Sequence, residues 1–190
     1  MEIKAADVMK LRKMTGAGMM DCKKALIEAE GDFARAQDII REKGKLIVAK
    51  RADRTATEGV VVTKIVGQKA YILCLACETD FVANGADFIK LTSDILDAAI
   101  AAKAHTLDEV KALTLADGSA VQDAITQRSG ITGEKMELDG YNVLEGDNIE
   151  VYDHMGKHTL ATMVQLNKEN AELGLSLIHI SEPTRRTPIS

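Results

Sequence analysis

The chain has 190 residues, a formal net charge of -5 at pH 7, and 46% hydrophobic against 28% charged side chains. This balance is that of a globular protein and excludes a wholly disordered chain, while the acidic charge argues against direct binding to nucleic acid. No apolar run reaches the roughly 18 residues needed to span a bilayer, and charged side chains follow Met1 in place of a secretory leader, so we expect a cytoplasmic protein without a membrane partner.

The first 45 residues predict three short helices, which must pack on one another to bury their apolar stripes. Val8 and Leu11 mark one face of the first helix, and residues 15–18 are expected to end it. The second helix has apolar side chains at the i, i+3, i+4, i+7 spacing of a single stripe. These side chains are Cys22, Ala25, Leu26 and Ala29.

A third helix is predicted after Gly31, which can close the preceding helix, with Asp32 as its N-cap and a stop near Gly44. The polar residues 45–58 then predict a linker or a loosely attached helix. Residues 1–54 hold 13 basic and 9 acidic side chains, whereas the rest of the chain holds 11 basic and 20 acidic side chains. The start of the chain is therefore net positive and the remainder net negative. The inward side chains of the third helix are predicted to be Phe33, Ala36 and Ile40.

Two strands joined by a tight turn are predicted next. The β-branched residues 60–66 meet Gly67, and the apolar residues 70–77 follow and run directly into residues 78–81. After Gly85 the apolar spacing becomes helical, which predicts a helix packed over the hairpin. Its inward positions are Phe88, Leu91, Ile95, Ala98, Ala99 and Ala102.

The second half predicts weaker helices over residues 107–130 and further strands from Tyr141 onward, punctuated by Gly146 and Gly156. Residues 175–190 differ in composition and resemble the translation of a sequencing adaptor, so no function is predicted for them. The predicted division is a helical module with its linker at 1–54, a first α+β subdomain at 55–138, the start of a second, incomplete subdomain at 139–174, and a non-native tail at 175–190.

Two pairs of closely spaced side chains, one of cysteines and one of histidines, are candidates for a redox or metal site. Cys74 and Cys77 lie three apart on a predicted strand, which sends their side chains to opposite faces, so buried strand cysteines are favoured over a redox or zinc site. His154 and His158 bracket a predicted turn without a third ligand, which favours turn histidines that face solvent. Cys22 and the other two cysteines are expected to be free thiols.

No catalytic constellation stands out in the sequence. The glycines of residues 16–18 precede Lys23 without the spacing of a P-loop, and no Ser/His/Asp or Cys/His arrangement is evident. We therefore predict no catalytic residue, no metal site and no cofactor. Met19 and Met20 are adjacent, so at least one is expected to be exposed, where a flexible apolar side chain suits a partner surface.

Phe81 is one of only three phenylalanines and follows the end of a predicted strand, between Asp80 and the loop-forming residues 84–85. The spacing leaves two interpretations open. The ring is either buried under its own helix or projects from the turn.

Two segments resemble the signatures of the elongation factor Ts family. Residues 11–26, Leu-Arg-Lys-Met-Thr-Gly-Ala-Gly-Met-Met-Asp-Cys-Lys-Lys-Ala-Leu, resemble its amino-terminal signature, and residues 79–83, Thr-Asp-Phe-Val-Ala, its second signature. Further similarity includes residues 144–147 and 152–154. The resemblance implies an α+β fold, with an amino-terminal three-helix module similar to ubiquitin-associated domains and a core of antiparallel strands with packed helices. The family's second subdomain normally continues with a helical hairpin, whose contacts are not carried over.

The resemblance also implies a function. Members of the family exchange guanine nucleotide on elongation factor Tu, binding its GDP-bound and nucleotide-free forms, with no small-molecule substrate of their own. A binding adaptor without exchange activity is the alternative, suggested by the helical module and its basic linker. The residues implied to disturb the partner's Mg²⁺ site are Thr79, Asp80, Phe81 and Val82. The residues implied to dock on the partner are Arg12, Met19, Met20, Lys23 and His154.

Overall fold

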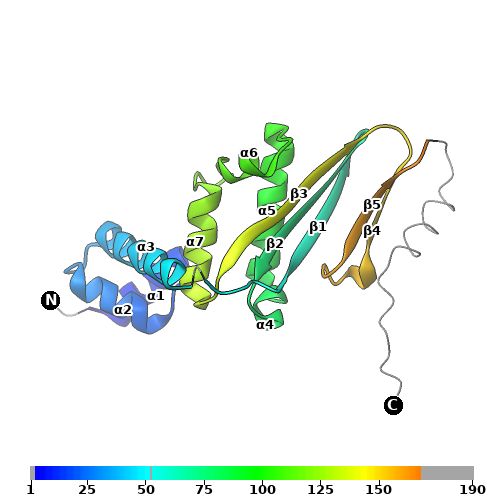
Figure 1. The fold of residues 1–190 in the computed structure, drawn as a ribbon. Coiled ribbons are helices and arrows are strands. Elements are labelled where there is room, and N and C mark those ends of the chain that lie inside the picture. The colour runs from blue at the N-terminus through cyan, green and yellow to red at the C-terminus, as the bar shows by residue number, and fades with distance from the viewer. Residues whose placement is uncertain (1–2, 52, 168–190) are drawn as a thin grey trace, which may run out of the picture.

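The computed structural model describes residues 3–51 and 53–167, and it confirms the predicted α+β class with antiparallel strands. Figure 1 shows three helices at one end, a three-stranded sheet with its helices in the middle and a two-stranded hairpin at the other end. The adaptor-like residues 175–190 lie outside the described residues. Within the described part, no helix is both long and apolar enough to cross a membrane.

The helical module at the amino terminus forms as its apolar stripes predict. Gly16 closes the first helix with φ +71°, and its N–H donates to the Arg12 carbonyl at 2.7 Å. The Asp32 carboxylate caps the third helix by accepting from the N–H groups of Ala34 and Arg35. The buried side chains of the module are Val8, Leu11, Ala17, Cys22, Ala25, Leu26, Ala29, Ala36 and Ile40. The helices are α1 (Ala5–Thr15), α2 (Met19–Glu28) and α3 (Phe33–Lys50).

The predicted stop of the third helix near Gly44 is wrong, because α3 continues to Lys50. Gly44 lies inside α3 where it crosses α7 (Val121–Thr132). A Cβ atom on Gly130 of α7 would lie 2.5 Å from the Cα atom of Gly44, so the two backbones touch. The glycine therefore serves a close helix crossing and not a helix end, and the first part of the predicted linker is helix packed on α7.

The central sheet has the strand order β1-β2-β3, with every neighbouring pair antiparallel. The predicted hairpin and the helix packed over it are confirmed, since α5 packs against β1 and β2. The predicted inward position of Ala102 is wrong, because this last residue of α5 is exposed. The third strand was missed in part, because it begins at Met136, ahead of the expected start at Tyr141. The predicted boundary between residues 138 and 139 lies inside this strand, and the domain division stays a prediction. The elements are β1 (Glu58–Val66), β2 (Lys69–Cys77), β3 (Met136–Glu145) and α5 (Ala86–Ala102).

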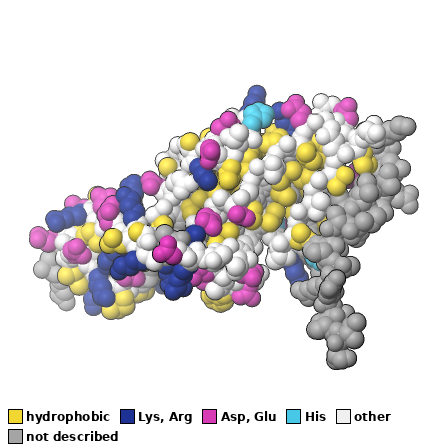
Figure 2. Space-filling model, in the orientation of Figure 1, with side chains coloured by type: hydrophobic (Ala, Val, Ile, Leu, Met, Phe, Trp, Pro, Cys, Tyr) yellow, Lys and Arg dark blue, Asp and Glu magenta, His cyan; other side chains and the backbone are white. Residues whose placement is uncertain are grey.

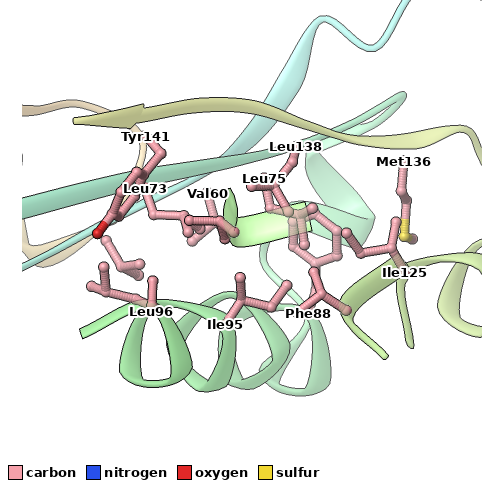
Figure 3. Close-up of a cluster of buried hydrophobic side chains, with 14 of the residues drawn as sticks. Val60, Leu73, Leu75, Phe88, Ile95, Leu96, Ile125, Met136, Leu138 and Tyr141 are labelled. Atoms are coloured by element: carbon pink, nitrogen blue, oxygen red, sulfur yellow. The ribbon is translucent and has the colours of Figure 1, made fainter. Parts of the chain in front are cut away.

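The main core lies between the sheet and α5. Figure 3 shows Phe88, Ile95 and Leu96 of α5 pointing at side chains from the three strands, with Ile125 of α7 beside Met136. Phe88 and Ile95 have no exposed surface. The strand side chains of this layer are Val60, Leu73, Leu75, Leu138 and Tyr141.

The other face of the sheet is partly covered by the two-stranded hairpin β4–β5. The N–H of Val61 donates to the His158 carbonyl at 2.7 Å, which ties this hairpin to β1. Ile72 and Cys74 border a cavity of about 210 Å³ beneath it. Figure 2 shows apolar side chains gathered over the sheet, while charged side chains of both signs cover the helical module. The remaining elements are α4 (Asp80–Ala83), α6 (Leu107–Lys111), β4 (Ile149–Asp153), the 3₁₀ turn η1 (His154–Gly156) and β5 (Ala161–Gln165).

Candidate functional site

The turn that follows β2 presents one aromatic side chain to solvent. We call residues 79–82 the tip. Thr79 is the N-cap of the short helix α4, and its hydroxyl oxygen accepts from the N–H of Val82 at 3.4 Å. Val82 packs partly against the core and Ala83 is buried, whereas Phe81 is 86% exposed. The Phe81 ring therefore projects from the turn and is not buried under its own helix.

The tip is held by the connection between α7 and β3. The N–H of Thr79 donates to one carboxylate oxygen of Glu134 at 3.1 Å, and the Thr79 hydroxyl donates to the other at 2.6 Å. Glu134 is itself fixed, since its carbonyl accepts from the Ser129 hydroxyl and its N–H donates to Thr132 Oγ1 at 3.3 Å. Because one carboxylate accepts two charge-assisted hydrogen bonds from Thr79, this residue at the base of the tip has little freedom to rotate.

Glu78 lies directly before the tip, and its side chain is only 13% exposed. Its carboxylate accepts hydrogen bonds from three residues. Arg51 donates at 2.9 and 3.2 Å, Arg54 at 2.9 Å and the backbone N–H of Lys135 at 2.6 Å. The Lys135 hydrogen bond, followed by those from Arg51 and Arg54, lowers the pKa of Glu78 to about 2. The carboxylate is therefore charged throughout the physiological range.

Acid is expected to remove the stability that Glu78 contributes. Because its folded pKa is lowered, the contribution is present above the ordinary value of 4.5 and is lost as the pH falls from 4.5 to about 2. Urea unfolding at pH 7 should therefore find Glu78→Gln less stable than the parent by about 1–3 kcal/mol, with the gap closing toward pH 2. Asp94→Asn, which breaks an exposed pair with Lys90, is the control and should cost below about 1 kcal/mol. A gap that stays constant with pH would contradict this assignment.

Asp80 is exposed at the start of α4, and its backbone is firmly held. Its carbonyl accepts from the backbone N–H of Asn84 at 2.9 Å and from the Asn84 side chain at 2.8 Å. A Cβ atom on Gly85 would lie 3.0 Å from the Val82 carbonyl oxygen, so the turn is tight. No hydrogen bond to the Asp80 carboxylate is found within residues 3–51 and 53–167, which leaves it available to another molecule.

The predicted docking residues do not gather around the tip. Arg12 and Lys23 are exposed on α1 and α2, and Met19 and Met20 are 44% and 64% exposed, which confirms that at least one of these methionines faces solvent. In Figure 1 these helices lie at one end of the molecule, and α4 lies between them and the β4–β5 hairpin, whose connection contains η1. His154, in η1, lies 3.1 Å through its Nδ1 from the Tyr152 hydroxyl. The predicted residues thus fall on three separate parts of the fold.

The two histidines occupy the predicted turn, and each faces solvent only in part. Both are half-buried, because His154 contacts Tyr152 and the His158 ring lies 2.6 Å from the Asp153 carboxylate. Turn residues that cover the sheet bury side chains that an isolated turn would expose.

The cysteines are free thiols, as expected. Cys77 faces the main core and Cys74 lies on the opposite face of the sheet, which confirms the predicted alternation. Burial, followed by the nearby Glu134 carboxylate, raises the pKa of Cys77 to about 11, so its thiol stays protonated at neutral pH. No group of three or more metal-binding side chains occurs in the described ranges.

Sequence reasoning missed Glu78 and Glu134, the two carboxylates that hold the base of the tip. The two side-chain donors to Glu78, Arg51 and Arg54, belong to the basic linker, but no pattern in the sequence pairs them with Glu78. Nothing local marks Glu134, whose contact with Thr79 joins residues far apart in the chain.

The fold and the tip together define a class: α+β proteins that combine a helical module with an exposed aromatic side chain on a firmly held turn. The sequence matches the family described as Elongation factor TS over residues 78–181. The chain belongs to the elongation factor Ts family.

Curated relatives extend this similarity to the helical module. Elongation factor Ts of Bacteroides thetaiotaomicron is 60% identical over 168 residues, which cover 88% of this chain and 51% of the relative. The protein of the same name from Parabacteroides distasonis is 57% identical over 178 residues, covering 94% and 54%. That of Rhodopirellula baltica is 49% identical over 154 residues, covering 81% and 47%. The chain spans about half the length of the curated relatives it matches.

Proposed function

We propose that the chain acts as a guanine-nucleotide exchange factor for elongation factor Tu in translation elongation. The observation that carries this proposal is the 86% exposure of Phe81 on a turn fixed by Glu78 and Glu134, in a member of the elongation factor Ts family. An exposed aromatic side chain on a fixed turn reaches a partner without loss of backbone freedom on binding. No cofactor and no small-molecule substrate enters the proposal.

The proposed mechanism uses the tip as a wedge. Phe81 enters between side chains of the partner near its Mg²⁺ site, while the Asp80 carboxylate makes polar contacts that hold the tip in register. Thr79 and Val82 keep the turn in shape. A bound divalent cation is among the largest charges in a nucleotide site, so a shift of its ligands weakens the hold on GDP.

The helical module is the proposed docking surface on the GTPase domain of the partner. Met19 and Met20 supply adaptable apolar contact area and Arg12 and Lys23 supply positive charge. His154 is assigned a contact with a different domain of the partner. The docking surface and the tip would thus engage together.

Thermodynamic coupling sets what such a factor does. When the exchange factor binds elongation factor Tu, it lowers the affinity of elongation factor Tu for nucleotide. Bound nucleotide lowers the affinity of elongation factor Tu for the exchange factor by the same ratio, because coupling between two ligands is reciprocal. The chain would therefore accelerate exchange in both directions, and the relative concentrations of GTP and GDP would set the outcome.

A GDP-release assay tests the proposal directly. Adding this chain to elongation factor Tu loaded with fluorescent GDP, with excess unlabelled GDP present, should raise the release rate in proportion to chain concentration until it saturates. An unrelated protein of similar charge is the control. A release rate that does not respond to a well-folded chain at any concentration would rule the function out.

The exposed methionines favour one alternative, a binding adaptor without exchange activity. Met14, Met19 and Met20 lie 44% to 64% exposed on α1 and α2, as a docking surface requires. The adaptor function predicts that the chain binds elongation factor Tu in a pull-down without changing GDP release. Binding accompanied by faster release would exclude it.

A further inference from the structure

The base of the tip and the helical module are joined by one nearly buried carboxylate. We propose that Glu78 is a positioning residue that fixes the tip relative to the helical module, so that Phe81 and the docking helices meet one partner at a set spacing. This inference rests on the proposed exchange function and adds a residue that touches neither nucleotide nor partner.

The first connection runs from α3 to Glu78. Arg51 follows the last turn of α3 directly, and its guanidinium, 29% exposed, holds both oxygens of the Glu78 carboxylate. Arg54 adds a third bond at 2.9 Å. Both Arg51 bonds come from the single nitrogen Nη1, and together with the bond from Arg54 they hold the residues that follow α3 against the end of β2.

The second connection runs through α7 and the residues after it. The N–H of Lys135 donates to Glu78, and the Glu134 carboxylate accepts two hydrogen bonds from Thr79. The α7–β3 connection is therefore bonded to the base of the tip as well. The Lys135 side chain also donates to the Arg54 carbonyl at 3.0 Å. One hydrogen-bonded unit therefore includes Arg51, Arg54, Glu78, Thr79, Glu134 and Lys135.

The far part of α7 holds the helical module itself. Gly130 lies against Gly44 of α3, and the Gln127 side chain donates to the Thr15 carbonyl at the end of α1 at 3.1 Å. An ion pair between Arg41 and Asp123, 3.5 Å apart, spans the same contact. One helix thus supports the module along its length and the tip at its end.

A purely stabilising role for Glu78 is the competing explanation. A largely buried ion pair is weak evidence for stability, since the cost of removing the charges from water offsets their attraction. The effect of Glu78 on the position of the tip is separate from its net effect on stability. Its carboxylate accepts hydrogen bonds from Arg51, Arg54 and Lys135 at once, which holds these parts of the chain together. Misplacement of a contact group by about 1 Å costs up to roughly a hundredfold in rate where the fit is close.

A double-mutant cycle with Phe81 separates these roles. If Glu78 acts by positioning the tip, Glu78→Gln should lower the saturating rate of GDP release by about tenfold, with less than about a threefold change in the half-saturating concentration. In the Phe81→Ala background the same substitution should cost less than about twofold, because the side chain it positions is gone. Asp94→Asn, on the exposed face of α5, is the matched control and should change neither quantity.

Amide hydrogen exchange of the free chain supplies a readout that does not depend on the partner. Glu78→Gln should speed exchange at residues 79–85 at least about tenfold while the amides of α5 stay protected. Arg51→Gln, which leaves the carboxylate in place, serves as a second variant should Glu78→Gln fold poorly, and it should act in the same direction.

The outcomes are distinct. An equal loss of release rate in both Phe81 backgrounds, or unchanged exchange at residues 79–85, would overturn the positioning role of Glu78. Failure of the unaltered chain to accelerate GDP release would instead overturn the exchange function, and the hydrogen-exchange result would still decide whether Glu78 fixes the tip.

Discussion

Replacing Phe81 with alanine is expected to slow chain-stimulated GDP release from elongation factor Tu by about thirtyfold or more. Loss of a buried aromatic anchor at a protein interface costs on the order of 2 kcal/mol, which corresponds to that factor in rate. Phe81 is 86% exposed in the free chain, so its removal leaves no cavity in the core. The thermal unfolding temperature of the variant should therefore match that of the parent, and the loss should appear only in the release assay.

The control for Phe81 is another exposed apolar side chain far from the tip. Ile65 is 49% exposed near the β1–β2 turn, at the opposite end of these strands from α4. Ile65→Ala should leave release within about twofold of the parent, since a single surface side chain away from the contact contributes little. Equal rates of GDP release with the Phe81→Ala and Ile65→Ala variants would contradict the proposed insertion of Phe81 into the partner.

Gly130→Ala is expected to lower the free energy of unfolding by roughly 1–3 kcal/mol, although alanine is the better helix former. The added Cβ atom would lie 2.5 Å from the Cα atom of Gly44, and a backbone atom cannot move aside as a side chain can. The α3–α7 crossing must therefore open, which displaces the docking helices from the tip. Urea unfolding measures the first effect and the GDP-release assay the second, where the half-saturating concentration should rise.

Gln122→Ala is the matched control on the same helix. Gln122 is exposed near the start of α7, so alanine there gains helix propensity without a new contact, and stability should stay equal or rise slightly. A Gly130→Ala variant as stable as Gln122→Ala would show that the crossing tolerates a methyl group.

The sequence predicted the secondary structure best where the apolar pattern is complete within one element. The α2 stripe from Cys22 to Ala29 and the hairpin of β1 and β2 belong to this kind. It failed at Gly44, because a glycine that allows two helices to touch has the same local signature as one that ends a helix. The start of β3 was predictable, since Met136 and Leu138 alternate with acidic residues in the period of a strand.

The site was less predictable than the fold. Spacing could not decide whether Phe81 was buried, because the answer depends on Val82 and Ala83 taking the inward positions of α4. The carboxylates that hold the tip act through contacts between residues distant in sequence, such as Glu78 with Lys135. Such contacts exist only once the sheet has assembled, so no local pattern contains them.

The place of Glu134 and Lys135, immediately before β3, has a consequence for folding during synthesis. The tip follows β2 directly, yet the groups that fix it leave the ribosome only after α5, α6 and α7 have been made. Pairing of β2 with β3 closes a long loop, and such distant contacts form late. A nascent chain that ends before Glu134 therefore lacks the carboxylate that holds Thr79, and we expect the base of the tip to be fixed to the rest of the fold only when the third strand docks.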